Sequence, residues 1–331
     1  MFTLLESKHD IARAQRRLES TIRRNFAKIA IKNIGYPGGI RRDARLHTDG
    51  QYWFETHDRR RGKNERRLNW FGYLRAGSNV DITVEVNPPY EGINKRTGGF
   101  YAKDSDSGKV YLCHSGRLGG GKKGVGMNAF LAWSNPPLVD VFDSTGKSRR
   151  GVLVLPVADT GAIRSVARYI DEIANFKIAR DRGETKTAEA REVQRVFREV
   201  YPEGRGRRKG QRASEIDYIS RHGDVVDALR AWCKANSKVD GKRLVKNAFF
   251  DLGVSSGRRL AEVYEVKTSS KRSNIYTAIG QLLVHGTAAN CKRTVVLPEK
   301  EPIAADLTGA LKRLKIKLVR FRLDSQKATI I

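Results

Sequence analysis

One segment of the chain, residues 181–212, limits how the rest can fold, because it is too polar and charge-dense to pack into an interior. A helical stretch, Thr187–Tyr201, leads there into the Gly- and Arg-rich sequence Pro202–Gly210. The apolar residues on each side must therefore form separate cores. We expect two domains, residues 1–180 and 213–331, joined by this charged helical linker, and a length of 331 residues suits that division.

The charge balance indicates the class of partner. The chain has 64 Lys and Arg against 36 Asp and Glu, a formal net charge of +28, while 39% of its residues are hydrophobic. This composition is globular, but the excess of one sign repels itself unless a polyanion is bound. We therefore expect nucleic acid as the partner, with an anionic membrane surface as the weaker alternative.

Several features argue against a membrane or secreted protein. The longest apolar stretches, Gly151–Ala158 and Phe249–Leu252, are far too short to span a bilayer. The first ten residues mix acidic and basic side chains and lack the apolar core of a signal peptide. The widely spaced cysteines Cys113, Cys233 and Cys291 form no CxxC pair, so neither a disulfide framework nor a structural zinc site is expected. These features predict an intracellular, cytoplasmic protein with reduced thiols.

The first domain is predicted to be β-rich with flanking helices. Apolar residues recur at helical spacing over Leu4–Ala30, which predicts an amphipathic helix. A second helix is expected after Asp159-Thr160, with its apolar face running to Ile178. Short alternating or β-branched runs separated by turns predict strands at Gln51–Thr56, Val80–Val86, Lys109–His114, Leu138–Phe142 and Gly151–Val157.

The second domain is predicted to combine helices and strands, which makes the whole chain an α+β protein. A turn at Ser255-Ser256-Gly257 is expected to connect its first two strands into a hairpin. The predicted elements are helix Ser214–Ala235, strands Arg243–Leu252 and Arg259–Thr268, helix Ser273–Ala288, strand Thr294–Leu297, helix Leu307–Lys315 and strand Lys317–Arg322.

This hairpin carries the residues that suggest chemistry. Glu265 and Lys267 are two positions apart in a strand, so their side chains project from the same face. Pairing of the two strands can bring Asp251, which we place at the end of the preceding strand, next to them. Two carboxylates with a neighbouring ammonium suit Mg²⁺ and the hydrolysis of a phosphodiester.

The tripeptide [DE]xK means little by itself in a Lys-rich chain, where it also occurs at Glu6, Glu184 and Asp240. Those copies fall in a helix start, the polar linker and a turn, whereas Glu265 lies on an apolar strand. The alternative interpretation is that Glu265 and Lys267 form a cross-strand surface ion pair, worth about 0–1 kcal/mol. A structural pair of that kind would not need Asp251 beside apolar bulk, where a carboxylate is costly to desolvate.

The arrangement resembles the PD-(D/E)XK nuclease superfamily, in which a strand Asp, a strand Glu and a Lys would match Asp251, Glu265 and Lys267. The resemblance covers about residues 213–323, and it implies a restriction-endonuclease-like αβββαβ core with a central mixed sheet. It also implies that Gln281, in the helix after the ExK strand, and Glu215, in the first helix, contribute to catalysis. The chain departs from the motif in having Phe250 and His285 at the family's Pro and Tyr positions.

A Gly-rich loop in the first domain, Gly116–Gly126, is nearly a nucleotide-binding P-loop. That motif requires a hydroxyl residue directly after its Lys and then a helix. In this chain Lys123 and Gly124 occupy those two places instead. Backbone N–H groups in such a loop can approach phosphates, with charge added by Arg117, Lys122 and Lys123. We expect it to hold the DNA backbone; a solvated glycine loop is the alternative.

Basic residues surround the aromatic residues of the first domain. Most of these aromatic side chains are expected in the core; the alternative for one or two of them is stacking on an extruded or unpaired base. Scattered histidines without metal-ligand spacing give no support to a zinc site. The DNA-binding residues predicted beyond the Gly-rich loop are Arg60, Arg61, Arg66, Arg67, Lys271 and Arg272.

Together these features predict a Mg²⁺-dependent DNA endonuclease of restriction-enzyme type, with Asp251 and Glu265 as metal ligands and Lys267 as the activating cation. The first domain would recognise double-stranded DNA and the second would cut it. A homodimer is expected, because cutting both strands at one place needs two active sites. The alternative is a non-catalytic nucleic-acid-binding or DNA-repair scaffold, in which the acidic residues of the hairpin are structural.

Overall fold

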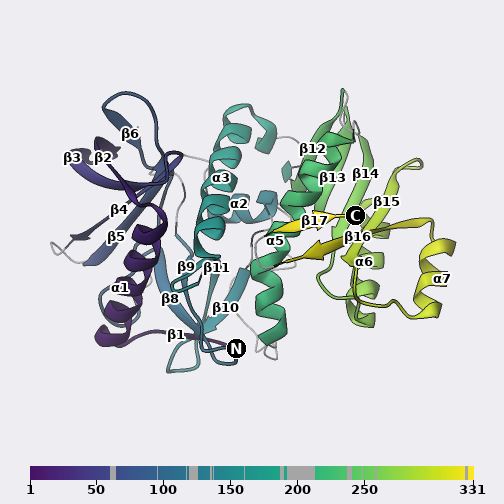
Figure 1. Ribbon diagram of the computed structural model, residues 1–331, viewed down its shortest axis with the longest axis horizontal. Helices are drawn as coiled ribbons and strands as arrows, with labels where there is room; N and C mark the ends of the chain where they lie inside the picture. Colours follow the sequence, from purple (N-terminus) through teal and green to yellow (C-terminus); the bar gives the residue numbers. More distant parts are fainter. Residues whose placement is uncertain are drawn as a thin grey trace. The chain divides into compact units, whose positions relative to one another are not determined.

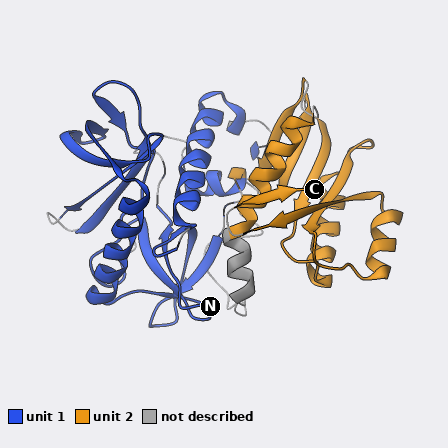
Figure 2. Ribbon diagram, in the orientation of Figure 1, with its two compact units in different colours: residues 1–132, 136–213 blue, residues 133–135, 214–331 orange. Residues whose placement is uncertain are grey.

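The computed structural model describes residues 1–59, 65–94, 96–116, 118, 126–134, 136, 138–159, 161–186, 190–191, 213–236, 241–247, 249–257, 259–324 and 327–331, with the backbone alone for 213–220. The chain forms two compact units, coloured separately in Figure 2. Unit 1 comprises Met1–Ala132 and Pro136–Ala213, and unit 2 comprises Trp133–Asn135 and Ser214–Ile331. Helices and sheets occur in both units, so the predicted mixture of α and β structure is confirmed (Figure 1).

A closed barrel forms one part of unit 1, with its strands in the order β1-β10-β11-β9-β8. The first strand of the chain closes it, because β1 pairs antiparallel with β8 on one side and parallel with β10 on the other. Closure leaves no unpaired edge that could pair with another chain. The barrel strands are β1 (Phe2–Leu4), β8 (Gly99–Asp104), β9 (Val110–His114), β10 (Leu138–Phe142) and β11 (Ser148–Pro156).

The second sheet of unit 1 has the strand order β6-β2-β3-β4-β5-β7. Two long hairpins, β2–β3 and β4–β5, supply most of its hydrogen bonds. Its core contains the buried rings of Trp53 and Trp70, so these aromatic residues are interior, as expected for most of them. The strands are β2 (Lys28–Tyr36), β3 (Gly39–Thr48), β4 (Tyr52–Arg59), β5 (Arg66–Tyr73), β6 (Asn79–Asp81) and β7 (Val84–Glu85).

The first helix is shorter than the sequence pattern predicted. The helix expected over Leu4–Ala30 is α1, Lys8–Asn25. The side chain of Ser7 caps its start by accepting the Asp10 N–H at 3.0 Å. The following residues form β2, because their backbone pairs with β3, a long-range contact that helical periodicity cannot reveal. The other helices among the described residues of unit 1 are α2 (Met127–Ser134), which was not predicted and whose last two residues are assigned to unit 2, α3 (Ala162–Asp181) and the 3₁₀ helix η1 (Glu184–Lys186).

A buried polar network joins α1 to both sheets of unit 1. The Gln15 side chain on α1 accepts a hydrogen bond from the Tyr101 hydroxyl of the barrel at 2.6 Å. Its amide nitrogen donates to Asn69 on β5 at 2.9 Å. Buried polar groups are stable only when they are paired, so this network holds the helix at one position on the two sheets.

Unit 2 contains a six-stranded mixed sheet in the order β12-β13-β14-β15-β16-β17. Strands β14, β15 and β16 run parallel, and the remaining pairs are antiparallel. Three helices pack with it: α5 (Ala213–Ala235), α6 (Arg272–His285) and α7 (Ala305–Arg313). The strands are β12 (Arg243–Asn247), β13 (Phe250–Ser256), β14 (Arg259–Val266), β15 (Lys292–Pro298), β16 (Ile316–Leu323) and β17 (Ala328–Ile330).

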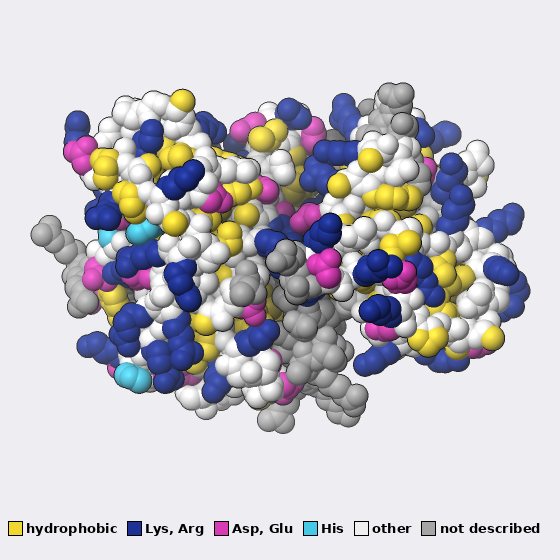
Figure 3. All heavy atoms as spheres, viewed as in Figure 1, with side chains coloured by type: hydrophobic (Ala, Val, Ile, Leu, Met, Phe, Trp, Pro, Cys, Tyr) yellow, Lys and Arg dark blue, Asp and Glu magenta, His cyan; other side chains and the backbone are white. Residues whose placement is uncertain are grey.

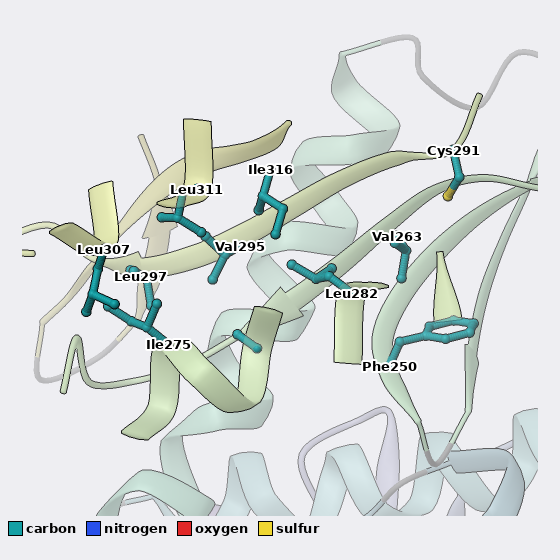
Figure 4. Close-up of a cluster of buried hydrophobic side chains, with 11 residues drawn as sticks. Phe250, Val263, Ile275, Leu282, Cys291, Val295, Leu297, Leu307, Leu311 and Ile316 are labelled. Carbon is teal, nitrogen blue, oxygen red and sulfur yellow. The ribbon is translucent and has the colours of Figure 1, made fainter. Parts of the chain in front are cut away.

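The helices of unit 2 cover opposite faces of this sheet. Val295 of β15 packs in a cluster with residues of α6 and α7, drawn in Figure 4, whereas the next residue, Val296, packs in a cluster with α5. Adjacent strand residues point to opposite faces, so β15 is apolar on both sides and lies between two helical layers. We call these clusters the α6–α7 cluster and the α5 cluster.

The strand predicted over Arg243–Leu252 is interrupted. Asn247 ends β12, and its side-chain oxygen accepts the N–H groups of Phe249 at 2.9 Å and Phe250 at 3.2 Å. This turn reverses the chain, and β13 returns antiparallel to β12. Asp251 therefore lies at the start of a strand, and the predicted position at a strand end was wrong.

Two predictions about compartment can be compared with the structure. Among the described helices, none is long and apolar enough to cross a membrane. The three cysteines are buried and none is in a disulfide.

Candidate active site

Strand β14 positions two residues of the site. Val263 belongs to the α6–α7 cluster, and its neighbour Tyr264 belongs to the α5 cluster, as does Val266. Because side chains alternate along a strand, Glu265 and Lys267 point to the same face as Val263. The ammonium of Lys267 lies 2.7 Å from Glu265 Oε1, so the two residues meet on the face covered by α6.

Pairing of β13 with β14 places Asp251 next to them. Its Oδ2 accepts the backbone N–H of Val266 at 2.8 Å, in continuation of the register that pairs Leu252 with Tyr264. The same oxygen lies 3.2 Å from His222 Nε2, which α5 supplies. Asp251 is 7% exposed, so its charge is held by protein groups more than by water.

Helix α6 fixes the ammonium of Lys267 from the other side. Lys267 Nζ donates to Gln281 Oε1 at 2.9 Å, and the Gln281 amide nitrogen lies 3.5 Å from the Phe249 carbonyl oxygen. Lys267 thus bridges a carboxylate on the strand and an amide on the helix. A Lys side chain with two fixed acceptors has one preferred position, which places its positive charge beside Glu265.

The two carboxyl groups have opposite pKa shifts. Burial by itself raises the pKa of Asp251, but His222, Lys267 and the Val266 N–H together outweigh it and hold the pKa below its ordinary value. Burial, followed by the negative charge of Asp251, raises the pKa of Glu265 to about 8, although Lys267 opposes this shift. His222 and Lys267 thus stabilise mainly the ionised form of Asp251, and Glu265 keeps its proton at neutral pH unless a further cation is bound.

The carboxylate of Glu265 is also incompletely satisfied. Its Oε2 is buried and has no hydrogen-bond partner among the described residues, and the side chain is 2% exposed. Such an orphaned oxygen is expensive in an interior and marks a place where a ligand is expected. With Asp251 it forms an oxygen-only donor pair, which fits Mg²⁺, a cation that takes one or two protein carboxylates and completes its shell with water and phosphate.

A larger set of protein ligands is absent from the part of the chain that the structure describes. There, no three His, Cys, Asp or Glu side chains are grouped as a metal site would require. A magnesium site needs only one or two protein carboxylates, with water and phosphate as its other ligands.

Four further predicted residues lie in or near α5 and α6. Gln281 joins the site as described. Glu215 is in α5, where only the backbone is described. Lys271 is exposed at the start of α6, and the guanidinium of Arg272 forms a two-point ion pair with Asp306 of α7 at 2.5 and 3.0 Å.

The remaining predicted DNA-binding residues belong to unit 1. Arg66 is half-buried on β5. The Arg67 guanidinium donates to Glu19 and to Asp58, each at 2.8 Å, so this side chain links β5 to α1 and β4. Arg60, Arg61, Arg117, Lys122 and Lys123 lie outside the described residues.

His222 is the site residue that sequence reasoning missed. It precedes Val225 by three positions and Leu229 by seven, which is the spacing of the buried stripe of α5. A polar side chain on such a stripe is a signal that could have been followed. Its partner could not be identified in that way, because Asp251 is on a strand that follows the helix.

Comparison with known proteins adds no family to this description. No protein-family model, no curated protein and no solved structure matches the chain. The function is therefore argued from the geometry of the site.

Proposed function

We propose that unit 2 is a Mg²⁺-dependent DNA endonuclease, in which Asp251 and Glu265 hold the metal. The observation that carries this proposal is Glu265 Oε2, a buried carboxylate oxygen without a partner among the described residues. It belongs to a group whose pKa is raised by burial and by the charge of Asp251. A divalent cation would satisfy the oxygen and balance the charge of both carboxylates at once.

The residues of the chain have separate roles in this reaction. The carboxylates of Asp251 and Glu265 would hold the metal at the strand pair. Lys267, held by Glu265 and Gln281, keeps a positive charge beside them, where it opposes the negative charge that develops on a phosphate. Gln281 is a positioning residue that acts through Lys267. When bound, Mg²⁺ supplies Lewis-acid stabilisation of the phosphoryl oxygens and makes a water molecule more acidic.

The order of elements supports the same assignment. Helix α5, the strands β12, β13 and β14, helix α6 and strand β15 follow one another as in the αβββαβ core that the PD-(D/E)XK resemblance implies. The acidic residues and Lys267 come from neighbouring strands of a mixed sheet between helices. A restriction-endonuclease-like fold for unit 2 is therefore part of the proposal.

DNA is the proposed substrate because the chain carries a formal net charge of +28. Lys and Arg side chains are spread over the visible face of each unit in Figure 3. Such a surface attracts the phosphate backbone of DNA. Because cutting both strands of a duplex needs two active sites, the proposal includes a homodimer. We assign recognition of the DNA target to unit 1.

Cleavage of supercoiled plasmid tests the proposal. Purified full-length protein would be incubated with modified and unmodified plasmid, with Mg²⁺ or with EDTA, and nicked and linear products would be measured. We expect cutting in Mg²⁺ alone, and a loss of about 100-fold or more in Asp251→Asn and Glu265→Gln. Binding of DNA, measured in Ca²⁺, should stay within about twofold.

Glu262 provides a matched control. It is on the same strand and also buried, but it is three residues from Glu265 and therefore points to the opposite face. Its carboxylate accepts the Tyr264 hydroxyl at 2.5 Å. Glu262→Gln should cut normally, and wild-type cutting by Glu265→Gln would contradict the assignment. Wild-type protein that binds every plasmid and cuts none would establish the scaffold alternative.

A further inference from the structure

A groove of about 1500 Å³ lies within unit 1, apart from the proposed active site. The turn of the β2–β3 hairpin, the strands β4 and β5, and the C-terminal half of α3 line it. Its volume exceeds the roughly 300–1000 Å³ of sites for single small molecules. The size therefore suits an extended ligand.

An exposed aromatic ring stands on one wall of this groove. Tyr36, the last residue of β2, is 40% exposed, and its ring lies 5.6 Å from that of the buried Trp70. The ring also packs on the hairpin turn, since a Cβ on Gly38 would lie 3.0 Å from Tyr36 Cε2. The backbone of the turn and a buried indole thus hold the ring in place while much of it stays exposed, which is the arrangement of a stacking platform.

Cations line the neighbouring strands. Arg59 on β4 and Arg66 on β5 are directly paired across the hairpin, so two like charges face one another on the groove wall. Such a pair is destabilising unless an anion lies between or beside the charges. Arg59 is exposed and makes no ion pair with the described part of the chain. Burial, followed by the charge of Arg59, lowers the pKa of Arg66, and the charge of Glu85 opposes this shift.

The acidic residues of the groove offset its basic residues only in part, since Glu85 acts on Arg66 and the others face different cations. Six lining residues are Lys or Arg and four are Asp or Glu. The Asp58 carboxylate is engaged by Arg67, which is not a lining residue, and Asp181 is engaged by the adjacent Arg180. The groove therefore presents a net positive wall next to an exposed aromatic ring.

We propose that this groove binds a single-stranded segment of nucleic acid, with an unpaired base stacked on Tyr36 and the adjoining phosphates against Arg59 and Arg66. A nucleotide chain is the ligand that offers flat apolar faces and regularly spaced negative charges together. In a duplex each base face is covered by its neighbours, so an aromatic platform favours unpaired bases. The inference goes beyond the nuclease proposal, since it needs no cleavage and concerns the other unit.

Direct binding by full-length protein tests the groove. The probes are a fluorescein-labelled oligothymidylate and a duplex of equal length, titrated in EDTA at fixed salt. Tyr36→Ala should weaken binding of the single strand by about tenfold or more and change duplex binding little. Tyr36→Phe should retain the affinity because the ring is kept.

A matched pair of charge variants tests the phosphate contacts. Arg59→Gln and Arg17→Gln each remove one positive charge, from the groove and from the exposed face of α1 respectively. Arg59→Gln should weaken single-strand binding several-fold more than Arg17→Gln. Equal effects of the two variants, or a Tyr36→Ala variant that is folded by circular dichroism and binds the single strand as wild type does, would overturn the proposal. If Tyr36→Ala does not fold, Tyr36→Leu replaces it, and unchanged affinity in that variant would have the same meaning.

Discussion

The stability of the metal-free protein should fall as the pH rises through neutrality, and Glu265 should be the cause. Its folded pKa is raised from 4.5 to about 8 by burial and by the charge of Asp251. Between these two values the native state keeps a proton that the unfolded state has lost. Folding then becomes less favourable with each rise in pH, and Glu265→Gln, which stays neutral, should remove this dependence.

The magnitude follows from the size of the shift. One pKa unit corresponds to about 1.4 kcal/mol, so a change from 4.5 to about 8 amounts to roughly 4–5 kcal/mol once the group is fully ionised. Between about pH 5.5 and 7.5 the free energy of unfolding should fall by about 2–3 kcal/mol. Solvent screening does not reduce this free energy much, because Glu265 is only 2% exposed.

Urea unfolding in EDTA provides the assay. Tryptophan fluorescence reports on both units, since Trp53 and Trp70 belong to unit 1 and Trp133 and Trp232 to unit 2, and the far-ultraviolet circular dichroism reports on the secondary structure of the whole chain. Wild-type protein and Glu265→Gln should have similar stability near pH 5, and the variant should be the more stable above pH 8. Mg²⁺ should remove most of the wild-type slope, because it stabilises the ionised carboxylates.

Two results would refute this reasoning. A wild-type stability that is flat or rising between pH 5.5 and 8.5 would mean that Glu265 is already ionised in the metal-free fold. A slope that persists in Glu265→Gln would assign it to another group. Glu262→Gln, on the opposite face of β14, should keep the wild-type slope and serves as the control.

Three further predictions concern single side chains. Lys267→Met should lower the rate of cleavage at saturating DNA by about 100-fold and leave the dissociation constant nearly unchanged; a loss of affinity with a normal rate would make Lys267 a phosphate contact. Gln281→Leu should lower the same rate by a smaller factor, and Gln281→Glu, which retains an acceptor for Lys267, should recover part of it; equal rates in both variants would remove the positioning role. Burial lowers the pKa of His114 from 6.5 to about 3. Below about pH 6.5 this histidine is therefore protonated in the unfolded chain but still neutral in the folded one, and unit 1 should lose stability as the pH falls. Thermal melts at pH 7 and pH 4 should show this loss in wild type and a smaller one in His114→Gln, and identical losses would contradict it.

Much of the candidate site was predictable from local sequence. The contact between Glu265 and Lys267 follows from the two-residue period of a strand, and it is present at 2.7 Å. Asp251 was expected beside them because a Gly-containing turn separates two apolar runs, and it reaches the N–H of Val266. Both inferences depend on neighbours in sequence, where backbone geometry leaves few alternatives.

One error arose where pairing between distant segments decides the structure, and another where a single side chain turns the backbone. Helical spacing continued past Asn25, but β2 takes the following residues because β3 provides hydrogen bonds to them. The strand expected over Arg243–Leu252 is divided by the side chain of Asn247, whose effect on the backbone outweighs the apolar run around it. Periodicity measures the burial of one segment and carries no information on which other segment it meets.

The sequence by itself determined the charge of the chain, the polar segment 181–212 that separates two apolar regions, and the residue types of the site on a hairpin. Only the tertiary structure decided which groups contact those residues. His222 of α5 lies against Asp251, and Gln281 of α6 accepts a hydrogen bond from Lys267. Glu265 Oε2 has no hydrogen-bond partner within the described residues. The groove beside Tyr36 likewise exists only where two hairpins and α3 meet. The physical reason is that strand alternation and net charge are local or additive properties, whereas the position of a helix on a sheet depends on packing between residues that are far apart in the chain.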